Sequence, residues 1–406
     1  MEFTRKWSAI ALLNLLVLAS VGLLLRYKIL YPLPFIDHKH LLHGHSHFAF
    51  AGWVSLAIYS IYVHLLKPDP IVLEKYNRIF QLHLFCSYGM LFTFPFMGYA
   101  LPSIAFSTLS IFISWWFCYV TWKELKKFRL NSTVRKWMRT ALLFNIISSL
   151  GTFALAYMMA TKNLHQQWYF GSVYFYLHFQ YNGWFLFSIL AFFFAILGNV
   201  ITYTQKIMAH RMYNVLIYTI VPAWFLSMLW MRVPNWMKIT AIIAGIVQLW
   251  FIVILLRRWQ VLKPVLNTRL TNAAKLLIGL SAIALLLKLF LQAVSGIPQL
   301  NQYAFGIRPI VIGFLHLVLL GFVTLFLIGC FVQLHLLSLN NRFSKTGIGI
   351  FLTGLLLNEI TLMLQGVAAI QFNSIPYSNQ ILLLAASLMF TGIALIVVNR
   401  FRTKTV

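Results

Sequence analysis

The chain has 406 residues, of which 61% are hydrophobic and only 9% are charged, and its mean hydropathy is +0.82. So few charged residues cannot cover the surface of a soluble domain of this size. A soluble enzyme and a nucleic-acid-binding protein are therefore excluded, although the formal net charge is +26. The three cysteines lie in apolar stretches without C-x-x-C spacing, which supports neither a disulfide framework nor a thiolate metal site.

Apolar stretches long enough to cross a bilayer predict an all-α, polytopic membrane protein with twelve transmembrane helices. Helices are expected because the hydrocarbon core offers no partner to an unpaired backbone group. The expected spans cover residues 8–30, 43–66, 79–100, 102–122, 138–160, 168–200, 212–231, 236–256, 271–294, 308–336, 346–371 and 379–399.

The positions of the basic residues test this count. With both termini in the cytoplasm, the inner loops and ends hold 24 Lys and Arg and the outer loops hold seven. This asymmetry is typical of the positive-inside rule and indicates an even number of spans. The stretch from Met1 to Arg26 has features of a signal peptide, but its long apolar part predicts an uncleaved first span. No linker interrupts the spans, so we expect one membrane domain over residues 1–406 without a clear internal repeat.

Histidines inside the spans are the principal candidates for chemistry, since ionisable groups in a membrane are costly and usually functional. Three histidines open the second span, and one each lies in the sixth and tenth, all expected in the outer half of the bilayer: His43, His45, His47, His178 and His316. Imidazole is the commonest nitrogen ligand, so converging rings predict a buried haem or metal site. On a helix His43 and His47 share a face, whereas His45 points about 200° away.

A plainer interpretation is that the histidines of the second span are solvated at the interface or hydrogen-bonded to neighbouring helices. The remaining histidines are weaker candidates. Those in outer loops are expected to be solvated or to assist metal capture, and those near the inner face are out of reach of an outer site: His38, His40 and His165 in the first group, and His64, His83, His335 and His210 in the second.

Two further side chains could take part in catalysis. Glu359 lies near the middle of the eleventh span, where it could relay protons, pair with Lys288 of the ninth span, or form a structural hydrogen bond. Tyr181 follows His178 by three residues on the same helical face, so its phenol could lie beside a bound centre or simply pack.

This topology resembles the catalytic subunit of the haem-copper oxidase superfamily. The resemblance implies haem ligands on the second and tenth spans, here His43, His45 or His47 and His316. It implies a copper or non-haem iron ligand on the sixth span, here His178, and assistance from His43 or His45. The sequence HGHSHFAFAGW at residues 43–53 also reads like a haem-binding stretch of nitric oxide reductases, and NnrS-like haem and copper membrane proteins have a similar second span.

The chain also departs from the superfamily. Its seventh span has no histidine where the superfamily has an adjacent pair, and its tenth span has one where the superfamily has two. The expectation is therefore a membrane haem protein, with copper as a further cofactor, that lies in the bacterial inner membrane. It would act as an oxidoreductase in electron transfer or in nitric oxide or oxygen handling, with an unidentified electron donor. The alternative is a transporter for a metal ion or small anion along a histidine-lined path.

Overall fold

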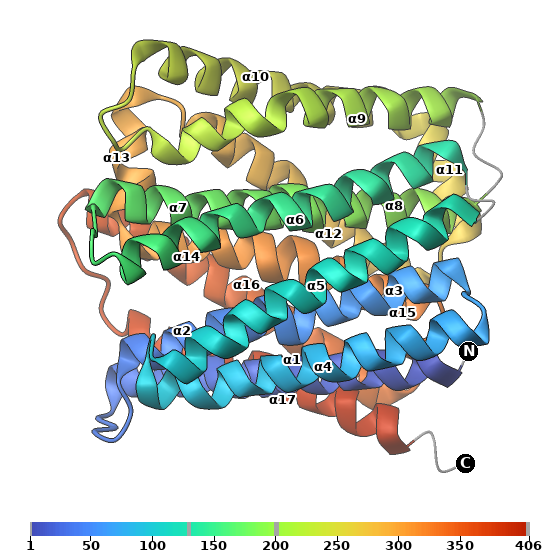
Figure 1. Cartoon of the computed structure of the whole chain (residues 1–406), viewed down its shortest axis with the longest axis horizontal. Coiled ribbons are helices and arrows are strands. Elements are labelled where there is room, and N and C mark those ends of the chain that lie inside the picture. Colours follow the sequence, from blue (N-terminus) through green and yellow to red (C-terminus); the bar gives the residue numbers. More distant parts are fainter. Residues whose placement is uncertain (1, 128–130, 199–202, 403–406) are drawn as a thin grey trace. The chain divides into compact units, whose positions relative to one another are not determined.

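The computed structural model describes residues 2–127, 131–198 and 203–402, and the regular elements in these ranges are all helices (Figure 1). Eleven of the helical segments are long and apolar enough to cross a membrane, judged by length and composition. The prediction of an all-α, multi-pass membrane protein is confirmed at this level.

The eleven segments coincide with eleven of the twelve predicted spans. They are α1 (Glu2–Leu30), α2–η1–α3 (His38–Leu66), α4 (Pro70–Met97), α5 (Leu101–Lys127), α6 (Ser132–Ala160), α7–η2–α8 (Gln166–Leu197), α10 (Asn235–Arg257), α12 (Asn272–Val294), α14–η5–α15 (Arg308–Gln333), α16 (Arg342–Ile370) and α17 (Ser378–Arg402).

The predicted span at 212–231 differs most from the structure. Helix α9 covers Tyr203–Trp224 and continues as a 3-10 turn at Phe225–Met228. Its first half carries Lys206, His210 and Arg211, so it is less apolar than the other eleven segments. Two short helices, α11 (Trp259–Arg269) and α13 (Pro298–Gly306), occupy predicted connections.

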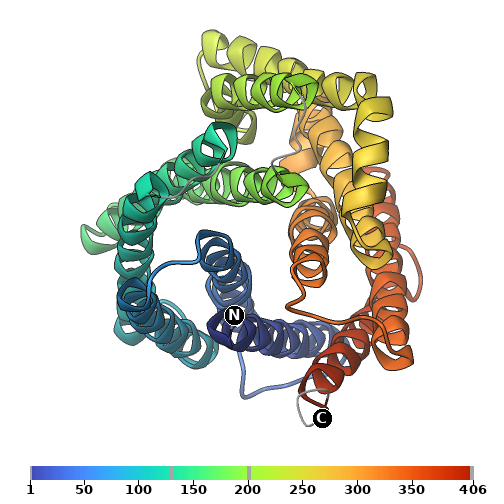
Figure 2. The ribbon, with the colours of Figure 1, turned by 90° about the vertical axis from the view of Figure 1, so that its right-hand side faces the viewer.

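By their internal contacts, the helices group into two compact units. Unit 1 comprises Met1–Glu124 and Cys330–Val406, and unit 2 comprises Leu125–Gly329. Within unit 1, α16 packs along α17, α1 packs against α17, and α2 packs against α4. Within unit 2, α9 lies beside α10, and α6 runs along α7, η2 and α8 (Figure 2). The single domain over residues 1–406 stays a prediction.

Three π-helical segments interrupt the helices that carry the candidate histidines. They are η1 (Ala49–Ser55), η2 (Phe179–Phe185) and η5 (Leu317–Thr324). Each begins one or two residues after a histidine, and the sequences from that histidine read HFAFAGW, HFQYNGW and HLVLLGF. The three histidines, His47, His178 and His316, are 131 and 138 residues apart. A short motif, in which a glycine and an aromatic residue follow the histidine after five and six residues, thus recurs in the second, sixth and tenth predicted spans. The absence of a clear repeat over whole spans stays a prediction.

Two of these π-helices accept a hydrogen bond at a backbone carbonyl from a side chain of the preceding predicted span. In a π-helix each backbone N–H bonds the carbonyl five residues earlier, and a carbonyl oxygen can accept a second hydrogen bond from a side chain. Asn14 of α1 donates to the Gly52 carbonyl at 2.7 Å, and Ser281 of α12 donates to the Phe322 carbonyl at 2.7 Å. The predicted first span thus donates a hydrogen bond to the second, and the predicted ninth span donates one to the tenth.

The remaining π-helix, η2, is bonded through a side chain. The Nε2 amide of Gln180 donates to Asn145 Oδ1 at 3.2 Å and to Ser148 Oγ at 2.8 Å, both on α6. Asn145 follows Asn14 by 131 residues, the separation that also relates His178 to His47. The recurrence therefore extends to a pair of neighbouring helices.

Candidate functional site

The histidines that open α2 separate into two groups within unit 1. The rings of His47 and Phe94 stack with centroids 4.4 Å apart and an interplanar angle of 8°. The Nε2 atom of His47 lies 3.4 Å from the Tyr99 hydroxyl oxygen, and the ring of His43 meets the same tyrosine at 4.8 Å. His43 and His47 therefore share a face, as the helical spacing predicts.

His45 faces α1 instead. Its ring is so close to that helix that a Cβ atom added at Gly22 would lie 3.2 Å from the His45 Cε1. Its Nδ1 atom is buried and, among the described residues, has no hydrogen-bond partner. The three histidines consequently do not converge on one centre.

The loop before α2 is fixed by a helix cap. The Asp37 side chain accepts a hydrogen bond of 2.9 Å from the backbone N–H of His40 and so begins the helix. This backbone bond is the main reason that the pKa of Asp37 lies below its usual value, and the charge of the nearby His40 adds to it.

His178 is buried in unit 2, where both of its ring nitrogens are engaged. Nε2 lies 2.8 Å from the Ile220 carbonyl, so it must carry the proton, and Nδ1 accepts a bond of 3.1 Å from the Asn182 Nδ2. Lys288 in turn donates to the Oδ1 of Asn182, which fixes the orientation of that amide. A metal could bind His178 only if one of these bonds were broken. The prediction that His178 is a metal ligand therefore lacks support from its geometry.

The two predicted catalytic side chains have ordinary surroundings. The ring of Tyr181 lies 6.5 Å from that of His178 and 6.4 Å from that of Phe314, as packing neighbours do. The carboxylate of Glu359 accepts a bond of 2.9 Å from Asn358 and interacts electrostatically with Arg26. The structure thus gives Glu359, like its predicted partner Lys288, an amide partner within its own unit.

The other histidines have local roles where the structure describes their bonds. His83 lies 3.0 Å from the Ala51 carbonyl of η1, His64 lies 3.3 Å from the Thr4 hydroxyl, and His210 lies 3.2 Å from the amide of Asn214. His316 is half-buried at the end of α14, directly before η5.

Comparison with known proteins does not identify a family for this chain. No protein-family model matches the chain, and a search of curated proteins finds no match either. Within the described residues, no group of three or more His, Cys, Asp and Glu side chains is arranged to hold a metal ion.

One important residue was missed by the sequence reasoning. Asn182 joins His178 to Lys288, but the sequence did not single it out because an amide within an apolar stretch carries no charge that would mark it. The shared motif HFxxxGW, at residues 47–53 and 178–184, was the available signal, since it singles out the segment that contains Asn182.

Proposed function

We propose that this chain is a haem-binding protein of the bacterial cytoplasmic membrane, similar to the haem-copper oxidases, that transfers electrons or handles nitric oxide or oxygen. The observation that carries the proposal is the recurrence of a histidine one or two residues before each of the three π-helices. π-Helical turns are rare and occur often at functional sites. The recurrence supports ligation by His47 and His316, whereas the third histidine, His178, is held by hydrogen bonds at both ring nitrogens.

The residues present fit a haem better than a copper ion. A haem iron takes one imidazole on a face, and the buried Nδ1 of His45 has no other described partner. Tyr99 and Phe94 would hold and orient His47 through a hydrogen bond and a stacked ring, as outer groups do at many metal sites. Copper requires several converging ligands, and His178, its predicted ligand, has both nitrogens engaged. We therefore include no copper site in this proposal.

The bound haem would supply reversible one-electron chemistry and an iron that binds diatomic gases. The protein side chains would exclude water, since the histidines lie in apolar helices, and would fix the imidazole orientation. His316 is the candidate on the tenth predicted span, next to η5.

The proposed topology has twelve spans with both termini in the cytoplasm, and α9 supplies the twelfth. The support is the distribution of basic residues, 24 on one side against seven on the other. This arrangement places the histidines of α2 near the outer face.

The optical spectrum of the purified protein tests the proposed function. After growth with sufficient haem, we expect a Soret band that shifts on reduction and again on exposure to nitric oxide or carbon monoxide. The matched control replaces His43, His45 and His47 together by Ala, and it should lose or alter the band. An identical spectrum in this variant would contradict ligation by α2.

Transport of a small anion is the second candidate function, and buried polar side chains around Lys288 in unit 2 favour it. It predicts flux of a small inorganic anion into liposomes that contain the purified protein. Haem content would then be irrelevant to the rate.

A further inference from the structure

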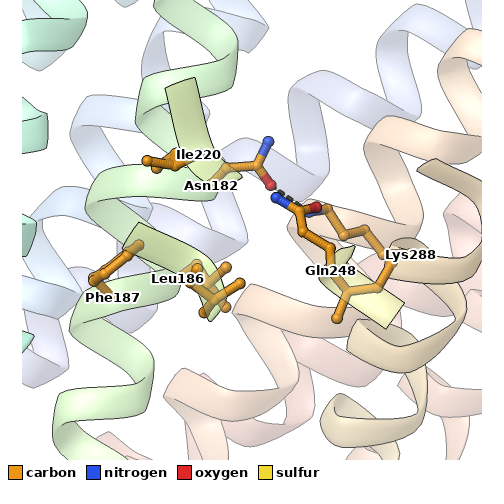
Figure 3. A pocket seen from close by; sticks show the side chains of 8 residues that line it. Asn182, Leu186, Phe187, Ile220, Gln248 and Lys288 are labelled. Carbon is orange, nitrogen blue, oxygen red and sulfur yellow. Dashed lines mark hydrogen bonds between the residues drawn. The ribbon is translucent and has the colours of Figure 1, made fainter. Parts of the chain in front are cut away.

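A chain of hydrogen bonds connects α12 to α9 inside unit 2. It begins at the Lys288 ammonium, which donates to the Asn182 side-chain carbonyl. The Nδ2 of Asn182 then donates to the Nδ1 of His178, and the Nε2 of His178 donates to the Ile220 carbonyl of α9 at 2.8 Å. Figure 3 shows Lys288 and Asn182 pointing toward one another from different helices.

A second chain connects the same two helices through α10. Gln292 donates to the Gln248 Oε1 at 3.1 Å, and the Nε2 of Gln248 donates to the Thr219 hydroxyl at 3.2 Å. Gln292 lies one helical turn from Lys288, and Thr219 adjoins Ile220. The two chains therefore form a closed polar belt. The belt is incompletely bonded, because the Oε1 of Gln292 is buried without a partner among the described residues.

Part of the belt also lines a narrow pocket. Lys288, Asn182 and Gln248 supply its polar groups, and the rest of the lining is Leu186, Phe187, Leu216, Ile220 and Leu289 (Figure 3). The unfilled space totals about 200 Å³, and no part of it is wide enough for a water-sized sphere. Only a small ligand could bind here, and only after some side chains move.

The charge of Lys288 has no counter-ion in its own unit. Only 2% of the residue is exposed, and its described partner is a neutral amide. All six acidic residues of the chain belong to unit 1, so residues 125–329 contain no Asp or Glu. An ammonium ion buried without an opposite charge is very unfavourable, and such groups either lose a proton or acquire an ionic partner.

We propose that Lys288, with the amides of Asn182 and Gln248, forms a binding site for a small monovalent inorganic anion of the size of chloride or nitrite. Each amide nitrogen has two N–H groups, and the described bonds use one of each. The second N–H groups and the ammonium give the pocket a surplus of donors and a positive charge. Both properties favour an anion, and only a small one is compatible with so narrow a pocket once side chains have moved.

Binding requires that Lys288 turns from the Asn182 carbonyl toward the anion. The pocket widens as this bond is released, and the anion replaces the amide oxygen as acceptor. None of the residues that would bind the anion is a proposed haem ligand, so the test of this site is distinct from the test of haem binding.

Equilibrium dialysis of the detergent-solubilised full chain against radiolabelled chloride tests the site. We expect saturable binding that nitrite displaces and gluconate does not. Lys288→Met should weaken the affinity at least about tenfold, a factor that corresponds to about 1.4 kcal/mol. Lys275→Met is the matched control, because Lys275 lies on the same helix but is partly exposed, and it should bind as the native chain does.

Two results would overturn the inference. One is absence of chloride and nitrite binding to the native chain, which would mean that Lys288 is a neutral amine without an anion. The other is equal binding by the native chain and Lys288→Met. If that variant does not fold, Gln248→Leu takes its place in the binding assay. The thermal stability of the native chain provides a further test. Its Tm should rise with chloride but not with gluconate at equal ionic strength, and an equal Tm in both salts would contradict the site.

Discussion

Asn14 on α1 donates a hydrogen bond of 2.7 Å to the Gly52 carbonyl of η1, and the hydroxyl of Tyr88 donates to the Asn14 Oδ1 at 2.9 Å. The Asn14 side chain thus links the backbone of η1 to a side chain of α4. The asparagine is fully buried, so water cannot replace it.

Replacing Asn14 by Leu should therefore destabilise the protein by about 1–3 kcal/mol, the usual cost of leaving a buried polar group unbonded. Thermal unfolding in detergent measures the effect. The control is Ser20→Ala on the same helix, since Ser20 is exposed and bonds only the carbonyl of Val17. An equal Tm for the two variants would mean that the π-helix does not depend on Asn14.

The recurring motif also places a glycine, Gly183, in η2. A Cβ atom added at Gly183 would lie 2.5 Å from the Phe144 Cβ, whereas one added at Gly279 would meet nothing within 4 Å. Gly183→Ala should lower the Tm markedly, because α6 and η2 would be forced apart.

Gly279→Ala is the control and should leave the Tm unchanged or raise it, because alanine favours helix by about 0.5–1 kcal/mol. If both alanine variants behave alike, the close approach of α6 and η2 is not needed for stability.

A structural feature can be predicted from this sequence only where it has its own pattern of residue types. Hydropathy locates the helices because a long apolar run has a single outcome in lipid. Helical geometry separates His45 from His43 and His47, as the structure confirms. The π-helices leave no hydropathy signal, because their residues continue the same apolar run. Asn182 was missed for a related reason, since its role depends on Lys288, which lies more than a hundred residues away.

His178 gives a test that distinguishes a metal ligand from a buried hydrogen-bonded histidine. His178→Ala removes the hydrogen bonds that the ring forms with the Ile220 carbonyl and the Asn182 amide nitrogen, so a loss of about 2–4 kcal/mol of stability is expected. Haem content should not change.

Tyr181→Phe serves as its control and should alter stability by less than about 1 kcal/mol, because the ring contacts are kept. Loss of a bound metal from His178→Ala at unchanged stability would restore the ligand role predicted from the sequence.

The proposed topology makes a prediction about accessibility. A reporter fused after Val406 should be active only if it works in the cytoplasm, and one inserted between His38 and His43 should report the outer side. The reverse pattern would move the histidines of α2 to the cytoplasmic face.

The haem content of the purified protein tests the central claim most directly. A pyridine haemochrome assay with iron analysis should find about one haem or more per native chain. His45→Ala, His47→Ala or His316→Ala should lower that content or change the spectrum, and His210→Ala, whose ring bonds Asn214, should do neither. A native preparation from haem-sufficient cells that holds neither haem nor iron would contradict the proposed function.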